Sequence, residues 1–387
     1  MRRLLVLASA MVFFDVAFYA AIAPLLPDYV DRFGLSEAGA GILQASYAAG
    51  TLLFALPAGL LAARTGPRRT VIGGLLLFAI SGMVFGFGDQ ILLLDVARFV
   101  QGAAGALIWS GSLAWLIAAF PPARRGAVIG TALGFAVAGA LLGPVLGGLA
   151  AEIGTEAVFS AVMVVAALLA LAASRMPEAG VIESQDLRLA AATMLSRPLL
   201  VGTAFVAMPS LMFGAVEVLV PLRIDELGGG HALIAAAFIA AAAIEGGLAP
   251  ISGRYSDRVG RRAPFVTGIA VAAAGMVAIA IAPGLGLIFA ALLLASFGAG
   301  LCFAPAMTAL SEAAEASRLH QGFAAGLANV AWALGQMTGA VVGGGLASAA
   351  GFAFPNLVVA ALLVLTAIYA NRVLSGGYAA PMTVRGR

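Results

Sequence analysis

The sequence predicts an all-α, polytopic membrane protein with twelve transmembrane helices in two pseudo-symmetric six-helix bundles. Hydrophobic residues make up 62% of the 387 residues and charged residues 10%, whereas soluble domains carry about 25% charged residues. Apolar runs of roughly 20 residues, long enough to cross a hydrocarbon core of about 30 Å, recur along the chain. The second half also repeats a glycine and arginine pattern of the first half, which indicates a duplicated unit.

Charged, proline and glycine clusters divide the chain into the predicted spans. These are residues 4–27, 38–62, 70–88, 91–118, 126–150, 157–174, 198–221, 232–252, 264–282, 286–310, 322–349 and 354–373. The longest polar stretch lies between the sixth and seventh spans. We therefore expect an N-terminal six-helix bundle over residues 1–174, a cytoplasmic linker over 175–197 and a C-terminal six-helix bundle over 198–387.

The first predicted span carries a carboxylate near the middle of the membrane. Asp15 follows Leu4 by eleven residues, which corresponds to a depth of roughly 16 Å at about 1.5 Å per residue. Pro24 and Pro27 should end or kink this helix. The residues that follow are expected in an exterior loop: Asp28, Asp31 and Arg32.

The fourth predicted span contains an arginine in an otherwise apolar stretch, residues 92–106. Arg98, Gln101, Gly102 and Gly105 stand at i, i+3, i+4 and i+7, so they share one helix face that a neighbouring helix can approach closely. A membrane arginine is costly and usually functional. The alternative is a local ion pair with Asp95, three residues earlier.

Glycines form a stripe in the fifth predicted span and a repeat between the two halves. Gly139, Gly143 and Gly147 lie on one side of the helix, and Pro144 should bend it. They recur 196 positions later at Gly335, Gly339 and Gly343. Two cytoplasmic loops repeat at an offset of 194, with Gly59, Arg64 and Gly66 in the first and Gly253, Arg258 and Gly260 in the second.

The arginines predict the orientation in the membrane. All 21 basic residues are arginine, and with the N-terminus inside only Arg32 and Arg223 face out, as the positive-inside rule requires. We therefore expect a multi-pass protein of the cytoplasmic (inner) membrane with both termini cytoplasmic. The arginines that give the chain its net charge of +3 are not clustered in one patch, which argues against nucleic-acid binding.

These motifs resemble those of the major facilitator superfamily over the whole chain. The loop after span eight resembles the signature loop in full, with Gly253, Asp257, Arg258, Gly260, Arg261 and Arg262. The loop after span two is similar but has Ala63 in place of the aspartate. The segment from Arg98 through Gln101 and Gly102 resembles the motif of proton-coupled members, and the stripe with Gly143 and Pro144 resembles that of antiporters.

The resemblance favours the twelve-span drug:proton antiporters, with a looser similarity to vesicular amine transporters through Asp15 and through Glu217 to Pro221. It implies alternating access around a central site between the halves. Asp257 and Arg258 would then form a charge latch between helices in the second loop, which the first loop lacks. The alternative is that both loops are topology signals only.

Four ionisable residues inside the spans are the candidate substrate- and proton-binding residues: Asp15, Arg98, Glu217 and Glu245. A buried carboxylate that must be neutralised by either a proton or a cation can exchange one for the other. Arg98 would assist as part of a proton relay. Asp15 could instead only hydrogen-bond a neighbouring helix, and Glu245 could only brace the arginine-rich loop.

Glu217 is expected near the exterior end of its helix, about 28 Å along it at about 1.5 Å per residue, where interfacial solvation is the alternative to function. Several aromatic residues are candidates for stacking on a flat or cationic ligand, although packing is the more frequent role. They are Trp109, Trp115, Trp332, Phe205 and Phe213.

The sequence therefore predicts a proton-coupled antiporter that exports small lipophilic, cationic compounds and works as a monomer in the lipid bilayer. An exporter of a defined metabolite, such as a sugar or amino acid, and a non-transporting membrane sensor are the alternatives. The sequence contains no nucleotide-binding loop, metal-ligand cluster or nucleophile motif. We expect no enzyme activity, no cofactor and no metal.

Overall fold

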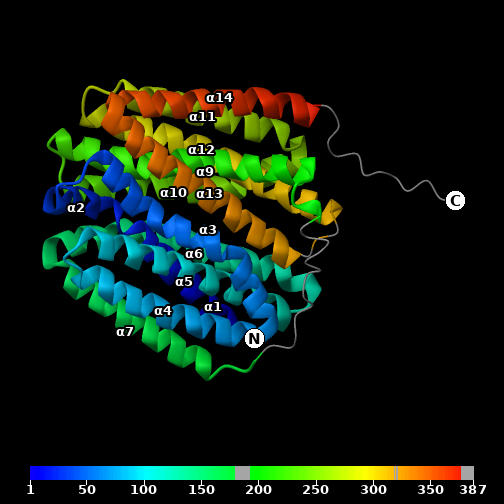
Figure 1. The fold of residues 1–387 in the computed structure, drawn as a ribbon. Coiled ribbons are helices and arrows are strands. Elements are labelled where there is room, and N and C mark those ends of the chain that lie inside the picture. Colours follow the sequence, from blue (N-terminus) through cyan, green and yellow to red (C-terminus); the bar gives the residue numbers. More distant parts are fainter. Residues whose placement is uncertain (179–191, 318, 320, 376–387) are drawn as a thin grey trace.

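The computed structural model describes residues 1–178, 192–317, 319 and 321–375. In this part of the chain twelve helical segments are long and apolar enough to cross a membrane, which confirms the predicted fold class. Figure 1 shows them running side by side in two halves, with α4 and α7 at one side and α11 and α14 at the other.

The first half begins with α1 (Arg2–Ala20), η1 (Ala23–Leu25) and α2 (Leu26–Phe33), followed by α3 (Glu37–Thr65), α4 (Pro67–Phe87), α5 (Ile91–Ala119), α6 (Pro122–Ile153) and α7 (Thr155–Ser174). The second half consists of α9 (Arg197–Glu226), α10 (His231–Val259), α11 (Arg262–Ala280), α12 (Leu285–Ala316), α13 (Gln321–Ala350) and α14 (Ala353–Ser375).

The first span differs from the prediction after Ala20. The expected exterior loop at Asp28, Asp31 and Arg32 is helical, because these residues belong to α2. Pro24 and Pro27 each stand in the first turn of a new short helix, where a residue without an N–H donor costs nothing. The helix α1 thus ends at Ala20, as the prolines were expected to end or kink it, and the chain continues through two short helices.

Each half has its own apolar core. One cluster of buried residues runs from Leu4 to Ala173, joined by Val218 and Ala340, and the other runs from Leu199 to Ala370. The halves meet mainly where α3 packs on α13 and α6 on α10. The exact division at residues 174 and 198 stays a prediction, since residues 179–191 of the predicted linker, including Arg188, lie outside the described part.

The two ends of the bundle contain different elements, and we call them the terminal end and the α2 end. The terminal end contains the first turn of α1 and the last turn of α14, and the α2 end contains α2 and the start of α3. An even number of spans places the start of α1 and the end of α14 on the same side. Arg318, His320, Arg385 and Arg387 lie outside the described residues.

The glycine stripes bring helix backbones into contact in both halves. Gly139 and Gly147 of α6 face the backbone carbonyls of Phe13 in α1 and of Ala21 at its C-cap. In the second half the repeated stripe of α13 faces α9 in the same way, with Gly335 against the carbonyl of Ala207. Since any side chain would collide there, the stripes position α1 and α9 against their neighbours.

Replacing one stripe glycine should destabilise the protein, whereas a glycine of the same helix that faces open space should not. A Cβ at Gly143 would lie 2.6 Å from the carbonyl oxygen of Ala17, and nothing lies within 4 Å of one at Gly134. We expect Gly143→Ala to lower the free energy of unfolding by about 1–3 kcal/mol through overpacking. Gly134→Ala should leave it unchanged or raise it slightly. Thermal unfolding in detergent measures both, and equal midpoints would contradict the packing argument.

Candidate functional site

Asp15 lies on α1 with its side chain turned toward α3 and α5. Its Oδ1 accepts a hydrogen bond of 2.8 Å from the Tyr47 hydroxyl, and its Oδ2 accepts one of 2.9 Å from the Trp109 indole. Asp15 is only 2% exposed. A carboxylate this deep in an apolar bundle is tolerated because both oxygens are hydrogen-bonded.

Glu217 is the centre of a second set of hydrogen bonds. Its Oε2 accepts from the hydroxyl of Tyr19 at 2.6 Å, from the amide of Gln44 at 2.6 Å and from the amide of Gln336 at 2.5 Å. The Gln336 amide also donates to the Tyr19 hydroxyl. These donors lie on α1, α3 and α13, so Glu217 of α9 touches both halves of the bundle.

We expected Glu217 near the exterior end of its helix, with interfacial solvation as the alternative to function, and its three side-chain donors do not fit that alternative. The helix α9 continues to Glu226 and contains Pro221 without ending there. The span therefore reaches further than its predicted end at residue 221. The carboxylate lies inside the bundle, held by three side chains.

Arg98 lies between the two carboxylate sites and stacks on aromatic rings. Its guanidinium carbon is 5.9 Å from the ring centre of Tyr19, 5.1 Å from that of Tyr47 and 5.8 Å from that of Phe85. Tyr19 donates to Glu217 and Tyr47 donates to Asp15. One buried cation is thus stacked on the two tyrosines that hold the two carboxylates.

Arg98 is 2% exposed and donates one hydrogen bond, of 3.2 Å, to Gln101. Its Nε and Nη2 atoms have no hydrogen-bond partner among the described residues. The alternative of a local ion pair is not observed there either, since Asp95 makes no salt bridge with it and has an unpartnered Oδ1. The guanidinium therefore retains free donors inside the bundle.

Two glycines of α5 allow this arrangement. Gly102 faces the backbone of Tyr47, and a Cβ at Gly105 would lie 2.7 Å from Oδ1 of Asp15. A side chain at either position would push α3 or Asp15 away. The predicted face of Arg98, Gln101, Gly102 and Gly105 is thus turned into the bundle, as expected from its helical spacing.

Glu245 does not join either set of hydrogen bonds. It lies half-buried on α10 beside Ser296 of α12, and Gly300 of α12 approaches its backbone closely. Among the aromatic candidates, Trp332 lies beside the hydrogen bonds of Glu217 and Phe205 does not. Trp332 packs edge-on against Tyr19 at 5.3 Å, whereas Phe205 packs in the core against Phe265 at 4.5 Å.

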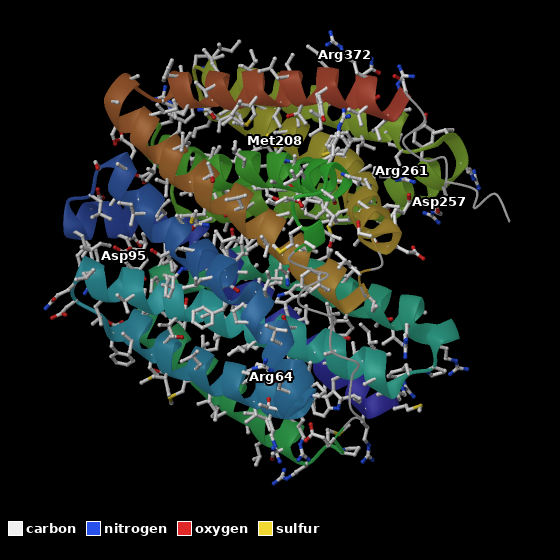
Figure 2. The ribbon with its side chains drawn as sticks, turned by 45° about the vertical axis from the view of Figure 1, so that its right-hand side comes forward. Arg64, Asp95, Met208, Asp257, Arg261 and Arg372 are labelled. Atoms are coloured by element: carbon white, nitrogen blue, oxygen red, sulfur yellow. The ribbon has the colours of Figure 1, made fainter. Side chains whose placement is uncertain are left out.

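The two signature loops lie at the terminal end. Gly66 and Gly260 adopt positive φ angles of 92° and 84°, a conformation that favours glycine. Figure 2 shows Asp257 and Arg261 of the second half together at one end of the bundle, and Asp95 of the first half at the opposite end.

The side-chain contacts of these loops that the described residues show do not connect the two halves. Arg261 pairs with Glu312, and Arg262 donates to Asn371. In the first loop Arg68 pairs with Glu178 at 3.0 Å. Asp257, Arg258 and Arg64 form no ion pair within the described residues. Gly59 and Gly253 face open space.

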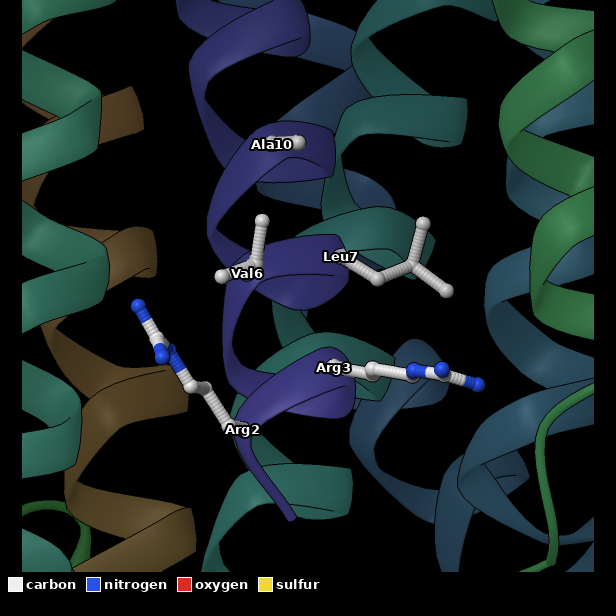
Figure 3. A pocket seen from close by; sticks show the side chains of 5 residues that line it. All are labelled: Arg2, Arg3, Val6, Leu7 and Ala10. Carbon is white, nitrogen blue, oxygen red and sulfur yellow. The ribbon is translucent and has the colours of Figure 1, made fainter.

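A hollow of about 520 Å³ lies beside the first turns of α1 (Figure 3). It is lined by Arg2, Arg3, Val6, Leu7 and Ala10. None of the candidate site residues contributes to it. No group of histidine, cysteine or acidic side chains suited to a metal ion occurs in the described part of the chain.

Sequence reasoning did not identify four residues that hold the carboxylates: Tyr19, Tyr47, Gln44 and Gln336. A signal was present, because an amide side chain inside an apolar span is costly unless it is hydrogen-bonded. Trp109 was considered only as a stacking residue, whereas its indole donates to Asp15.

The family model of the Major Facilitator Superfamily matches this chain over residues 5–318 and 203–376. The chain is 31% identical over 124 residues to the MFS-type transporter ppzB of Metarhizium rileyi (strain RCEF 4871), which covers 31% of this chain and 26% of that protein. It is 36% identical over 102 residues to the multidrug resistance protein Stp of Mycobacterium tuberculosis (strain ATCC 25618 / H37Rv), which covers 26% and 19%. The alignments thus span about a quarter or less of these relatives.

The fold is also that of a solved transporter. The chain superposes on the crystal structure of a D-xylose-proton symporter with a TM-score of 0.76 at 18% identity, over 95% of this chain and 96% of that one. Families of this kind are transporters and in general not enzymes. The family match over most of the chain and the twelve-helix fold show that this protein belongs to the Major Facilitator Superfamily of membrane transporters.

Proposed function

We propose that the protein is a proton-coupled antiporter that exports small lipophilic cations by alternating access. The observation that carries this proposal is the arrangement of two carboxylates, the buried Asp15 and the half-buried Glu217, around the buried Arg98. With both carboxylates ionised, the cluster has one negative charge in excess. Either a proton or a monovalent cation can balance that charge, and this is the requirement for exchange.

The surroundings of the cluster favour an organic cation over a metal ion. Tyr19, Tyr47, Trp109 and Trp332 present aromatic surface next to the carboxylates, and aromatic faces attract organic cations. The similar protein Stp of Mycobacterium tuberculosis is named a multidrug resistance protein. Glu245 and the charge latch of Asp257 with Arg258 belong to the same proposal as accessory groups.

A neutral hydroxylated substrate is the second candidate. The amides of Gln44 and Gln336 lie beside Tyr19, and each amide has a buried carbonyl oxygen without a partner in the described residues. Amide and hydroxyl groups are the usual ligands of sugars and amino acids. The excess carboxylate and the aromatic surface favour the cation.

Inside-out membrane vesicles provide the direct test. A proton gradient, acid inside, should drive uptake of a fluorescent lipophilic monocation, and collapse of the gradient should abolish it. Asp15→Asn should lose this uptake but still fold and insert, because a buried neutral amide is cheaper than a buried charge. Full uptake by Asp15→Asn, or transport of neutral sugars in preference to cations, would contradict the proposal. Absence of any transport, with substrate binding retained, would favour a sensor.

The indole of Trp109 should matter through its hydrogen bond and not only through its bulk. Trp109→Phe removes one of the two donors to Asp15, and a bond to a charged group contributes roughly 1.5–3 kcal/mol. We expect the apparent affinity for the cation to fall by about tenfold or more. Trp115→Phe is the matched control on the same helix, because the Trp115 indole has no partner among the described residues. Equal transport by the two variants would mean that Trp109 acts by packing.

The orientation is also part of the proposal, and thiol labelling tests it. Cys302 is the single cysteine, so Cys302→Ser gives a background for Leu195→Cys at the terminal end and Gly230→Cys at the α2 end. Both positions are exposed. An impermeant maleimide should label position 230 in intact cells and position 195 only after permeabilisation. The reverse pattern would show that the termini face outward.

A further inference from the structure

We propose that Glu217 is a charge-dependent lock between the two halves, and that Tyr19 and Gln44 are the positioning residues through which it holds the α2 end closed. This inference rests on the proposed exchange of protons for cations. It adds the step that prevents the empty carrier from changing its conformation.

The hydrogen bonds to Glu217 cross the interface between the halves. Tyr19 of α1 and Gln44 of α3 donate from the first half to Glu217 of α9 in the second. Gln336 of α13 donates to Glu217 within the second half and to the Tyr19 hydroxyl across the interface. Breaking the contact with Glu217 therefore removes two of these three hydrogen bonds between the halves, and leaves only that between Gln336 and Tyr19.

All three donors converge on a single oxygen, Oε2, at 2.5–2.6 Å. Such an arrangement suits an ionised carboxylate, which accepts several short bonds. A proton on the other oxygen, or the amide of Glu217→Gln, would leave an acceptor at this position but remove its charge, and neutral hydrogen bonds are roughly half as strong as charge-assisted ones. The carbonyl oxygens of Gln44 and Gln336 have no partner among the described residues, so the new O–H or N–H donor would also draw these amides out of their present orientation. The closed arrangement thus depends on the charge.

Asp15 provides the contrast within the same site. Its two hydrogen bonds come from Tyr47 and Trp109, which belong to the same half as Asp15 itself. Neutralising Asp15 leaves the bonds across the interface in place. The two carboxylates therefore have different tasks, with Asp15 recognising charge and Glu217 joining the halves.

Other titratable and charged groups on the neighbouring helices surround Glu217. They are Tyr19 of α1, Arg98 of α5 and Glu245 of α10. Tyr47 of α3 packs on Tyr19 and donates to Asp15 of α1. The charge of Arg98 attracts the Glu217 carboxylate, and that of Glu245 repels it. None of them hydrogen-bonds Glu217 except Tyr19.

Further contacts between the halves lie at the α2 end. His231 of α10 contacts Asp28 of α2 at 2.7 Å, and Ser348 of α13 donates to Glu37 of α3 at 2.9 Å. These pairs are more exposed than the Glu217 site, and exposed pairs contribute little. We therefore assign the lock to Glu217 and treat the outer pairs as secondary.

The lock gives a coupling rule. With Glu217 ionised and no cation bound, the α2 end stays closed and the carrier cannot turn over. When a proton or a substrate cation neutralises Glu217, the halves separate at that end. Exchange then proceeds, whereas movement of the empty, unprotonated carrier is prevented.

Distances between spin labels test the lock directly in the full-length protein. We choose Asp31→Cys on α2 and Ala349→Cys on α13, both exposed, in the Cys302→Ser background. Glu217→Gln should raise the ratio of open to closed α2 ends by at least about tenfold. Gln44→Leu and Tyr19→Phe should raise it less, since each leaves the carboxylate in place. Glu152→Gln, an exposed carboxylate, and Asp15→Asn should leave it unchanged.

Acidification supplies a second readout. The open fraction of the wild type should increase as pH falls, and that of Glu217→Gln should not depend on pH. Identical distributions for the wild type and Glu217→Gln would overturn the lock, as would equal opening by Asp15→Asn.

Transport separates the failure of the lock from the failure of the proposed function. Glu217→Gln should equilibrate a fluorescent monocation across vesicles but not accumulate it against a gradient. Proton-driven accumulation by Glu217→Gln would overturn the lock while leaving the antiporter intact. Cation export retained by Asp15→Asn would instead contradict the proposed function, and the distances would still decide the lock.

Discussion

The constraint on which this structure depends is the burial of charge inside a lipid-spanning bundle. Asp15 and Arg98 are each 2% exposed, and an isolated charge in that position would be very costly. The tyrosines solve this problem together, because Tyr19 and Tyr47 give hydroxyl donors to the carboxylates and ring faces to the guanidinium. The site therefore exists only while α1, α3, α5 and α9 stay in register.

That register comes from glycine. Gly102 and Gly105 of α5 face α3 and Asp15, and Gly139 and Gly147 of α6 hold α1 by its backbone. In lipid no hydrophobic effect drives helices together, so close backbone packing carries the association. The glycines thus belong to the site as much as the charged residues do.

The sequence was sufficient for the twelve spans, the repeat and the inward face of Arg98, because hydropathy and helical spacing are local properties. It was not sufficient for the partners of the carboxylates. Tyr19 and Gln336 are 317 positions apart, and no spacing rule connects them. Glu217 was placed near the exterior end because the predicted span ended at residue 221, whereas α9 continues to Glu226. Pro221 only removes a hydrogen bond there, and its neighbours compensate.

The repeat explains the frame but not the chemistry. The glycine stripes of α6 and α13 face α1 and α9 in the same way, so both halves keep the same packing. The charged residues do not follow this symmetry, because Asp15 and Glu217 are 202 positions apart instead of 194 or 196, and α12 has no arginine that corresponds to Arg98. A symmetric pair of carboxylates would give two equivalent sites with no distinction between binding and closure. Because of this asymmetry, Asp15 is hydrogen-bonded within one half, whereas Glu217 is hydrogen-bonded across the interface. Only a change in the charge of Glu217 can therefore alter how the two halves are held together.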